Sequence, residues 1–298
     1  MKKNYIYVAI LAAILFGFSS CSDFLDRIPD DELSDGSFWK TPNDAKMFIA
    51  DVYRQALPAG DGNGDIDGDI DSDNAVHGIK WAAGDVSRGI YDPANMGWSG
   101  DYNAIRACNV LLTKIDMIPD YDQTEKEATM GEAHFLRGFI YFGLIQTYGD
   151  VPYVDQPLDL KEMGEITRTP VEEVYAKVME DFDYAIAHLP TQWGSSDYGR
   201  ATKGAAYAMK ARAALYFKHF DTAAEAAKAV MDSGEYELFD ANNTGQYAKL
   251  FWEEQEACKE AILVRQFNAP TLTNYIIGWE CFPTKGWGGI NPTQSLVD

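Results

Sequence analysis

The stretch of sequence that most constrains the fold runs from Gly131 to Pro152 and reads GEAHFLRGFIYFGLIQTYGDVP. Its apolar residues recur three, four and seven positions apart, which is the period of a helix whose flank meets other helices. Small residues interrupt the pattern at Gly131, Ala133, Gly138 and Gly143. Because small residues let a neighbouring backbone approach closely, they predict helix-on-helix packing. Gly149 then supplies a left-handed exit and Pro152 forbids continuation, so we expect a core helix that ends there.

The composition supports a folded chain with a substantial core. Of the 298 residues, 46% are hydrophobic and 13% are aromatic, which is enough for one large or two medium domains. The formal net charge of -21 would repel a phosphate backbone. Nucleic acid is therefore not an expected partner.

The first 21 residues have the layout of a lipoprotein leader. Lys2 and Lys3 precede an apolar run over residues 5–18, and Ser19 and Ser20 follow before Cys21. The run is shorter than the roughly 20 apolar residues that span a bilayer, so it predicts a signal peptide over residues 1–20. A cysteine directly after two small residues can accept diacylglycerol, and we expect lipid on Cys21 to anchor the mature protein in a membrane. The alternative is an ordinary signal peptide followed by an incidental cysteine.

Three further cysteines leave the disulfide state open. Cys108 lies in an apolar helical pattern, where it is expected to pack as a small hydrophobe. Cys258 and Cys281 could pair, but spacing does not decide this. The sequence has no CxxC motif and no His/Cys cluster, so zinc is not indicated.

Residues 59–74 read AGDGNGDIDGDIDSDN and predict an acidic loop. Its alternating carboxylates could converge on calcium, a hard cation that prefers oxygen ligands. The candidate ligands are Asp65, Asp67, Asp69 and Asp71. Counted from Asp61, an EF-hand loop would need glycine at the sixth place and glutamate at the twelfth, and the sequence has Ile66 and Ser72 there. A solvated acidic loop is the alternative to a calcium site.

Other segments carry helix signals. Thr41 and Pro42 predict a capped helix start, and the run from Arg168 to Glu172 has the pattern of a capping box. Residues 203–217 and 222–231 form an alanine-rich pair that resembles a tetratricopeptide repeat. Beyond this pair the pattern changes, since residues 260–267 are β-like and the remainder is rich in glycine, proline and aromatic residues.

Five motifs occur in one order along the chain: YNAIRACNVLL, EAHFLRG with YGDVP, RTPVEEVY with HLP, GRATKGAA, and GGINPTQSLVD. Together they resemble the SusD/RagB family of outer-membrane lipoproteins, and the resemblance covers essentially all of residues 21–298. His134 and Gly138 depart from the usual signature but stay polar and small, respectively. Family members continue well beyond the last motif, so we expect this chain to be the N-terminal part of such a protein.

The resemblance implies a mainly α fold, with a tetratricopeptide-like helical body over residues 21–240, long loops, and the beginning of an irregular C-terminal domain over residues 241–298. It also implies a cell-surface lipoprotein of the outer membrane that captures a nutrient glycan and passes it to a SusC-like TonB-dependent transporter. Some relatives bind peptides instead. A peptide-binding uptake lipoprotein of the RagB type and a helical-repeat scaffold without a small ligand are therefore the alternatives.

The residues favour binding over catalysis. The sequence has no nucleophile elbow, P-loop, HExxH motif or dinucleotide fingerprint, so we do not expect an enzyme. Sugars stack their CH faces on aromatic rings and need polar partners for their hydroxyls. The candidate glycan-binding residues are Trp81, Arg88, Tyr91 and Asp92 in one segment, with Tyr275 and Trp279 in a second. These rings could instead pin long loops to the helical body, which is the reading we give Trp39, Trp98, Trp193 and Trp287.

Overall fold

The computed structural model describes residues 38–57, 72–77, 89, 97–240, 242, 244–251, 257–267 and 290–294. Residues 38–40 belong to an N-terminal unit, Met1–Lys40, and all other described residues belong to a second unit, Thr41–Asp298. The second unit contains the following elements: α3 (Pro42–Ala56), β1 (Ala75–His77), α4 (Ser99–Lys114), η4 (Ile115–Met117), α5 (Gln123–Tyr148), α6 (Leu160–Glu165), α7 (Val171–His188), η5 (Ser195–Asp197), α8 (Lys203–Tyr216), α9 (Phe220–Asp232), η6 (Tyr247–Phe251) and β2 (Ile290–Pro292). The prediction of a mainly α fold is confirmed.

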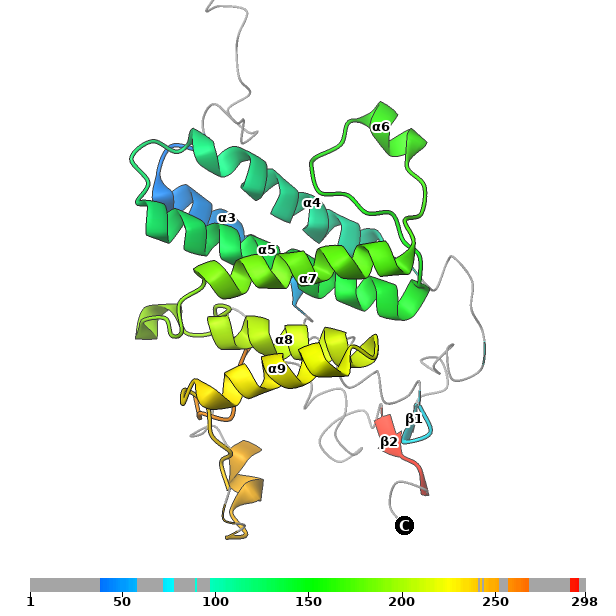
Figure 1. Ribbon diagram of the computed structural model, residues 1–298, viewed down its shortest axis with the longest axis vertical. Helices are drawn as coiled ribbons and strands as arrows, with labels where there is room; N and C mark the ends of the chain where they lie inside the picture. The colour runs from blue at the N-terminus through cyan, green and yellow to red at the C-terminus, as the bar shows by residue number, and fades with distance from the viewer. Residues whose placement is uncertain are drawn as a thin grey trace, which may run out of the picture. The chain divides into compact units, whose positions relative to one another are not determined.

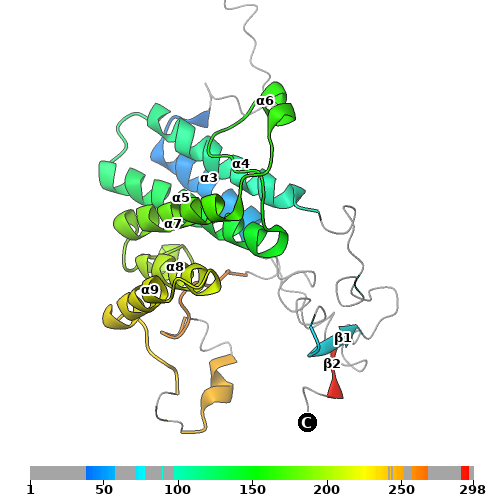
Figure 2. The same ribbon diagram turned by 45° about the vertical axis from the view of Figure 1, so that its right-hand side comes forward.

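Six of the helices pack into a row with α5 near its centre (Figures 1 and 2). Helices α3 and α4 contact α5 and each other, and α7 contacts α5. Helix α8 packs on α7, and α9 packs on α8. We call α3, α4, α5, α7, α8 and α9 the helical body. A row in which each helix contacts its neighbours is the arrangement of helical repeats, and the α8–α9 pair is the hairpin that the alanine-rich segments predict.

Helix α5 confirms the core-helix prediction. It begins at Gln123, where the Asp122 carboxylate accepts a hydrogen bond from the backbone N–H of Glu125 at 3.0 Å. It ends at Tyr148, and Gly149 follows with φ of +66°, a conformation that favours glycine.

The small residues of α5 allow α7 to approach. A Cβ at Gly138 would lie 3.1 Å from the Phe182 ring, and a Cβ at Gly131 would lie 3.3 Å from Leu189. A Cβ at Gly143 would meet nothing within 4 Å. The predicted close packing is therefore real at two of these three glycines.

A buried charge network joins α4, α5 and α7. The Arg137 guanidinium donates two hydrogen bonds to the Asp181 carboxylate, at 3.0 and 2.6 Å, and one to the Asn109 side-chain oxygen at 2.8 Å. His134 lies 2.7 Å from the same carboxylate. The Arg137 and Asp181 side chains are 7% and 4% exposed, so the pair is desolvated and its partners must be present together.

The two predicted helix starts have different outcomes. At α3 the Asp44 carboxylate accepts a hydrogen bond from the Thr41 N–H at 2.7 Å, so the capped start is confirmed. At α7 the capping-box prediction is wrong, because the helix begins one residue after Pro170 and no side chain of the Arg168–Glu172 run caps it. The Asp150 carboxylate, from the turn after α5, accepts the Val171 N–H at 2.8 Å instead.

Residues 260–267 correct a second expectation. The β-like pattern does not form a strand there, and the segment is irregular. It lies against the turn before α8, where a Cβ at Gly199 would be 3.0 Å from the Val264 carbonyl oxygen. The Arg265 guanidinium donates a hydrogen bond to the Leu57 carbonyl, at the end of α3. The segment therefore contacts the turn before α8 and the end of α3, and it does not pair in a sheet.

Two further observations concern the body. Cys108 is a buried free thiol, as expected, and burial raises its pKa to about 12. Among the described helices, none is both long enough and apolar enough to cross a membrane.

Candidate functional site

The candidate residues from the sequence lie outside the described residues. They are Cys21 for lipid, Asp65, Asp67, Asp69 and Asp71 for calcium, and Trp81, Arg88, Tyr91, Asp92, Tyr275 and Trp279 for the glycan. The structure does describe the elements that flank several of these segments. It therefore fixes where the segments begin or end in the fold.

A two-stranded antiparallel ladder joins two distant parts of the chain. In β1 and β2, Ala75 pairs with Pro292, Val76 with Asn291, and His77 with Ile290. Thr293 extends the contact, because its N–H and its hydroxyl donate hydrogen bonds to the Asn74 and Asp73 carbonyls, at 2.8 and 2.6 Å.

The ladder brings the ends of the two aromatic segments together. Residues 78–96, with Trp81 and Tyr91, follow His77, while the segment with Tyr275 and Trp279 precedes Ile290. His77 and Ile290 are directly opposite each other, so both segments leave the same end of the ladder. Two groups of candidate residues, predicted separately from the sequence, thus share one anchor.

The first aromatic segment reaches the helical body at Trp98. This ring stands at the start of α4 and meets Tyr102 and Tyr148 edge-on, with ring centroids 5.8 and 5.1 Å away. The Arg168 guanidinium lies 5.1 Å from the Trp98 centroid, within the range of a cation–π contact. The prediction that Trp98 is a packing residue is confirmed.

A cavity of 310 Å³ lies beside this aromatic cluster. Trp98, Tyr102, Pro152 and Met163 supply much of its apolar wall, and Arg106 is among its few polar side chains. The Tyr102 hydroxyl donates to the Pro152 carbonyl at 2.6 Å, and burial raises the pKa of this tyrosine. The hydroxyl is therefore neutral at physiological pH and serves to hold the wall in place.

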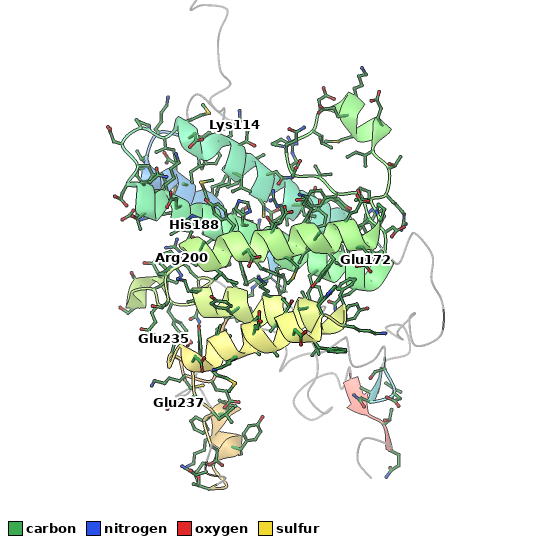
Figure 3. The ribbon with its side chains drawn as sticks, viewed as in Figure 1. Lys114, Glu172, His188, Arg200, Glu235 and Glu237 are labelled. Atoms are coloured by element: carbon green, nitrogen blue, oxygen red, sulfur yellow. The ribbon has the colours of Figure 1, made fainter. Side chains whose placement is uncertain are left out.

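The sequence analysis missed a second buried charge centre, at Arg200. Its guanidinium donates to both carboxylate oxygens of Glu132, at 2.8 and 2.6 Å, and to Asp197 at 2.8 Å. Tyr53 donates its hydroxyl proton to Glu132 at 2.9 Å and accepts the Ala201 N–H at 2.7 Å. Figure 3 shows Arg200 on the same side of the helical body as His188, the last residue of α7.

This centre joins three parts of the helical body through the buried Glu132 carboxylate. Burial raises the pKa of Glu132, and the Arg200 guanidinium opposes that shift. Burial also raises the pKa of Tyr53 well above its usual value. The arginine and the tyrosine together hold the Glu132 carboxylate, so it ties α3 and α5 to the turn before α8. The EAHFLRG motif begins with Glu132, so the sequence drew attention to this residue. No sequence pattern predicted that Glu132 would pair with Arg200.

Within the described residues, no group of three or more His, Cys, Asp or Glu side chains is arranged to hold a metal ion. The aspartates predicted to bind calcium come just before the ladder in the chain, and they are not among those residues. Their binding of calcium stays a prediction.

Comparison with known proteins adds to this geometry. A family model described as starch-binding and associating with the outer membrane, of the SusD-like type, matches residues 23–215. The chain belongs to the SusD-like family. This confirms the resemblance drawn from the five motifs.

Curated relatives of the chain include SusD-like proteins of Formosa agariphila. Two of them are 24% identical over 278 residues and 29% identical over 264 residues. These matches cover 88% and 86% of this chain but 51% of each relative, so the chain spans about half the length of the curated relatives it matches.

Solved structures of SusD-like proteins share the fold. A SusD-like protein of Bacteroides fragilis is 29% identical, with a TM-score of 0.76, and the match covers 91% of this chain and 55% of that one. A second protein of the same species, described as a SusD-like carbohydrate-binding protein, has a TM-score of 0.78 at 24% identity over 87% of this chain and 53% of that one. A laminarin-binding SusD-like protein has a TM-score of 0.62 at 23% identity over 73% of this chain and 50% of that one.

Proposed function

We propose that this chain binds a nutrient glycan at the surface formed by the two aromatic segments, and delivers the glycan to a SusC-like TonB-dependent transporter. The observation that carries the proposal is the β1–β2 ladder. Its pairing of His77 with Ile290 gives the segments with Trp81 and Trp279 a common starting point. Segments that start side by side can present their rings to one ligand.

The chemistry of these segments suits a sugar. Trp81, Tyr91, Tyr275 and Trp279 offer flat faces for the CH groups of pyranose rings. Arg88 and Asp92 offer a donor and an acceptor for hydroxyl groups. The family model's description as starch-binding and the laminarin-binding relative support a polysaccharide ligand over a peptide.

The location of the protein follows from the same proposal. The family is associated with the outer membrane, and we propose that lipid on Cys21 holds the chain at the cell surface after residues 1–20 are removed. Residues 21–240 would then be the helical domain and residues 241–298 the beginning of a second domain. No catalytic step is part of this proposal.

Affinity electrophoresis tests the ligand class. The chain is run in native gels that contain starch, laminarin or no polysaccharide, and a parallel titration uses mixed peptides of three to eight residues. We expect at least one polysaccharide to slow migration and the peptides to give no binding signal. Binding of peptides together with unchanged migration in every polysaccharide gel would replace this proposal with peptide uptake.

A further inference from the structure

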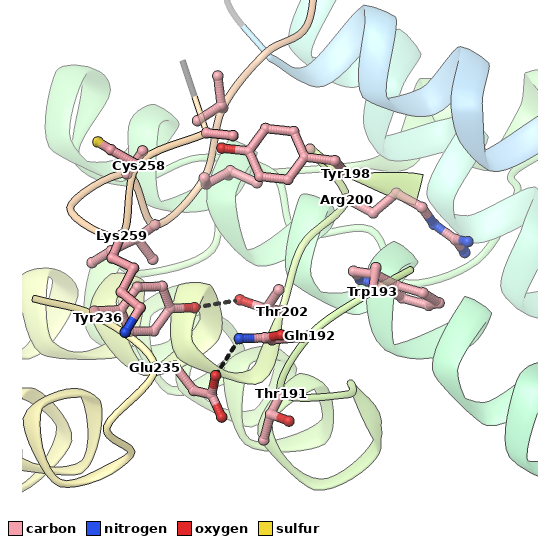
Figure 4. Close-up of a pocket in the computed structure, with 16 residues that line it drawn as sticks. Thr191, Gln192, Trp193, Tyr198, Arg200, Thr202, Glu235, Tyr236, Cys258 and Lys259 are labelled. Carbon is pink, nitrogen blue, oxygen red and sulfur yellow. Dashed lines mark hydrogen bonds between the residues drawn. The ribbon is translucent and has the colours of Figure 1, made fainter. Parts of the chain in front are cut away.

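A second cavity lies between the α7–α8 connection, the residues after α9 and residues 257–264, and it contains none of the candidate residues of the two aromatic segments. Its volume is 290 Å³, at the small end of the roughly 300–1,000 Å³ that is typical of ligand pockets. Three aromatic side chains line it, namely Trp193, Tyr198 and Tyr236, and Figure 4 shows Tyr236 beside Lys259, across the cavity from Trp193. Residues 257–259 and 261–264 complete the lining.

The part of the lining that carries Trp193 and Tyr198 is anchored by side-chain contacts. Arg200, fixed by Glu132, stacks on Trp193 with 3.7 Å between the guanidinium carbon and the ring centroid. The Trp193 indole N–H also donates to the Ala201 carbonyl at 2.7 Å. Tyr198 and Gly199 directly precede this anchored pair, so the backbone that carries the Tyr198 ring is fixed before any ligand binds.

The turn itself requires glycine at position 199. Gly199 has φ of +97°, a conformation that side-chain-bearing residues rarely adopt, and a Cβ there would lie 3.0 Å from the Val264 carbonyl oxygen. The close approach brings the Val264 backbone against the turn that carries Tyr198. Tyr198 is 40% exposed at this junction, which is high for a large aromatic residue on a rigid turn.

Polar groups of both hydrogen-bonding types surround the cavity. The Gln192 side-chain amide donates to Glu235, and the Thr202 and Tyr236 hydroxyls are 2.8 Å apart (Figure 4). Lys259 contributes an ammonium group at the rim, 3.6 Å from the Glu237 carboxylate. The lining thus combines amide, hydroxyl, carboxylate and cationic groups. Its charged side chains already have partners, because Arg200 pairs with Glu132, Lys259 pairs with Glu237, and Glu235 accepts a hydrogen bond from Gln192.

We propose that this cavity is a second carbohydrate-binding site, which takes one or two pyranose units of a glycan with Tyr198 as the stacking face. A sugar matches the lining because it is neutral, has flat apolar faces, and carries hydroxyls that both donate and accept hydrogen bonds. A strongly charged ligand would compete with the ion pairs already present, and a wholly apolar ligand would cut the polar rim groups off from water.

The site would work together with the aromatic segments but does not depend on them. The cavity shares no residue with the two aromatic segments, so an experiment can reject one proposal and support the other. Two sites on one chain raise the affinity for a long glycan without any new contact, because the second binding event becomes intramolecular. The cavity would therefore favour polysaccharides over short oligosaccharides.

Isothermal titration with short oligosaccharides tests the inference. The probes are maltohexaose and laminarihexaose, and the proteins are the unmodified chain, Tyr198→Ala, Tyr198→Phe and the double variant Trp81→Ala with Tyr91→Ala. With at least one probe we expect two sites on the unmodified chain and on Tyr198→Phe, and one site on Tyr198→Ala. A thermal melt of each variant shows that it is folded, and Tyr198→Ala should melt within a few degrees of the unmodified chain.

The outcomes separate the two proposals. Loss of one site in Tyr198→Ala but not in Tyr198→Phe supports the cavity, whatever the double variant does. Loss of a site in the double variant alone supports the aromatic segments and overturns the cavity. Titrations with both probes in which Tyr198→Ala matches the unmodified chain likewise overturn the cavity.

Discussion

The helical body and the β1–β2 ladder hold distant parts of the chain together by very different means. The body uses long helices, close glycine contacts and two buried arginine–carboxylate centres, at Arg137 and Arg200. The ladder uses three residue pairs and the hydrogen bonds of Thr293. From this difference we infer that the helical body contributes most of the folding stability. The ladder instead joins the chain at one end of each segment proposed to bind glycan. Each prediction below changes one of these regions and asks whether the other responds.

The largest effect is expected at the Arg137 centre. Arg137→Leu leaves the buried Asp181 carboxylate without its guanidinium, and breaking a buried pair in this way costs about 3–5 kcal/mol of unfolding free energy. Lys177→Ala is the control, because Lys177 and its partner Glu180 are both exposed and solvent screens their interaction, so we expect little change in stability. Urea unfolding measures both. Equal stability of the two variants would show that the centre does not hold the body together.

Calcium, if it binds the aspartates before the ladder, should stabilise the folded chain appreciably. A ligand at 100 times its dissociation constant contributes about 2.7 kcal/mol. We expect chelation to lower the melting temperature of the unmodified chain and to leave the double variant Asp67→Ala with Asp69→Ala unchanged. Identical melting curves with and without chelator, in the unmodified chain, would leave a solvated acidic loop.

Gly138 and Gly143 offer a matched pair on one helix. Gly138→Ala places a Cβ 3.1 Å from Phe182 and should cost about 1–2 kcal/mol through overpacking. Gly143→Ala meets nothing within 4 Å and should gain up to about 1 kcal/mol from helix propensity. The readout is the midpoint of urea unfolding. An increase in stability at both positions would mean that α7 can shift to accommodate the new Cβ without a loss of unfolding free energy.

The smallest change in stability is expected at the ladder. Thr293→Val removes the hydroxyl that donates to Asp73 and should cost less than about 1.5 kcal/mol, the net value of an ordinary hydrogen bond. Glycan affinity should fall all the same, because both aromatic segments start at this ladder. Thr113→Val on α4 is the control, since its hydroxyl bonds only the carbonyl one helical turn back. Unchanged affinity in Thr293→Val would separate the ladder from recognition.

The same difference explains what could be predicted from the sequence. The helices of the body were predictable because their apolar residues follow long periodic patterns. The end of α5 was predictable because Gly149 and Pro152 terminate a helix. The ladder was not, because strands of three residues carry no usable period and their partners are more than 200 residues apart. Three other interactions could not be predicted because their partners are distant in the sequence. They are the pairs Arg137–Asp181 and Arg200–Glu132, and the cap that Asp150 provides for α7. The strand prediction for segment 260–267 was wrong, because its β-branched residues Ile262 and Val264 line the Tyr198 cavity and, among the described residues, pair with no strand.

The candidate site shows the same limit. The residue types in the two segments indicate that they suit a glycan, and the family resemblance implies the class of ligand. Neither could show that the segments of Trp81 and Trp279 share an anchor, since that depends on the register of His77 with Ile290. The Tyr198 cavity was equally hidden, because its walls come from the α7–α8 connection and from residues 235–236 and 257–264.

The central claim is the proposal that Trp81 and Tyr91, in the segment that follows β1 in the chain, bind glycan and do not hold the fold together. The most direct test pairs calorimetry with a thermal melt on the double variant Trp81→Ala with Tyr91→Ala. Stacking contributes about 0.5–1.5 kcal/mol per ring beyond area, so we predict a loss of glycan affinity of tenfold or more at the ladder site with the melting temperature nearly unchanged. Core aromatic rings behave in the opposite way, since truncating one costs about 3–5 kcal/mol of stability. A marked fall in melting temperature with affinity unchanged in the remaining folded protein would contradict the claim and assign both rings to packing.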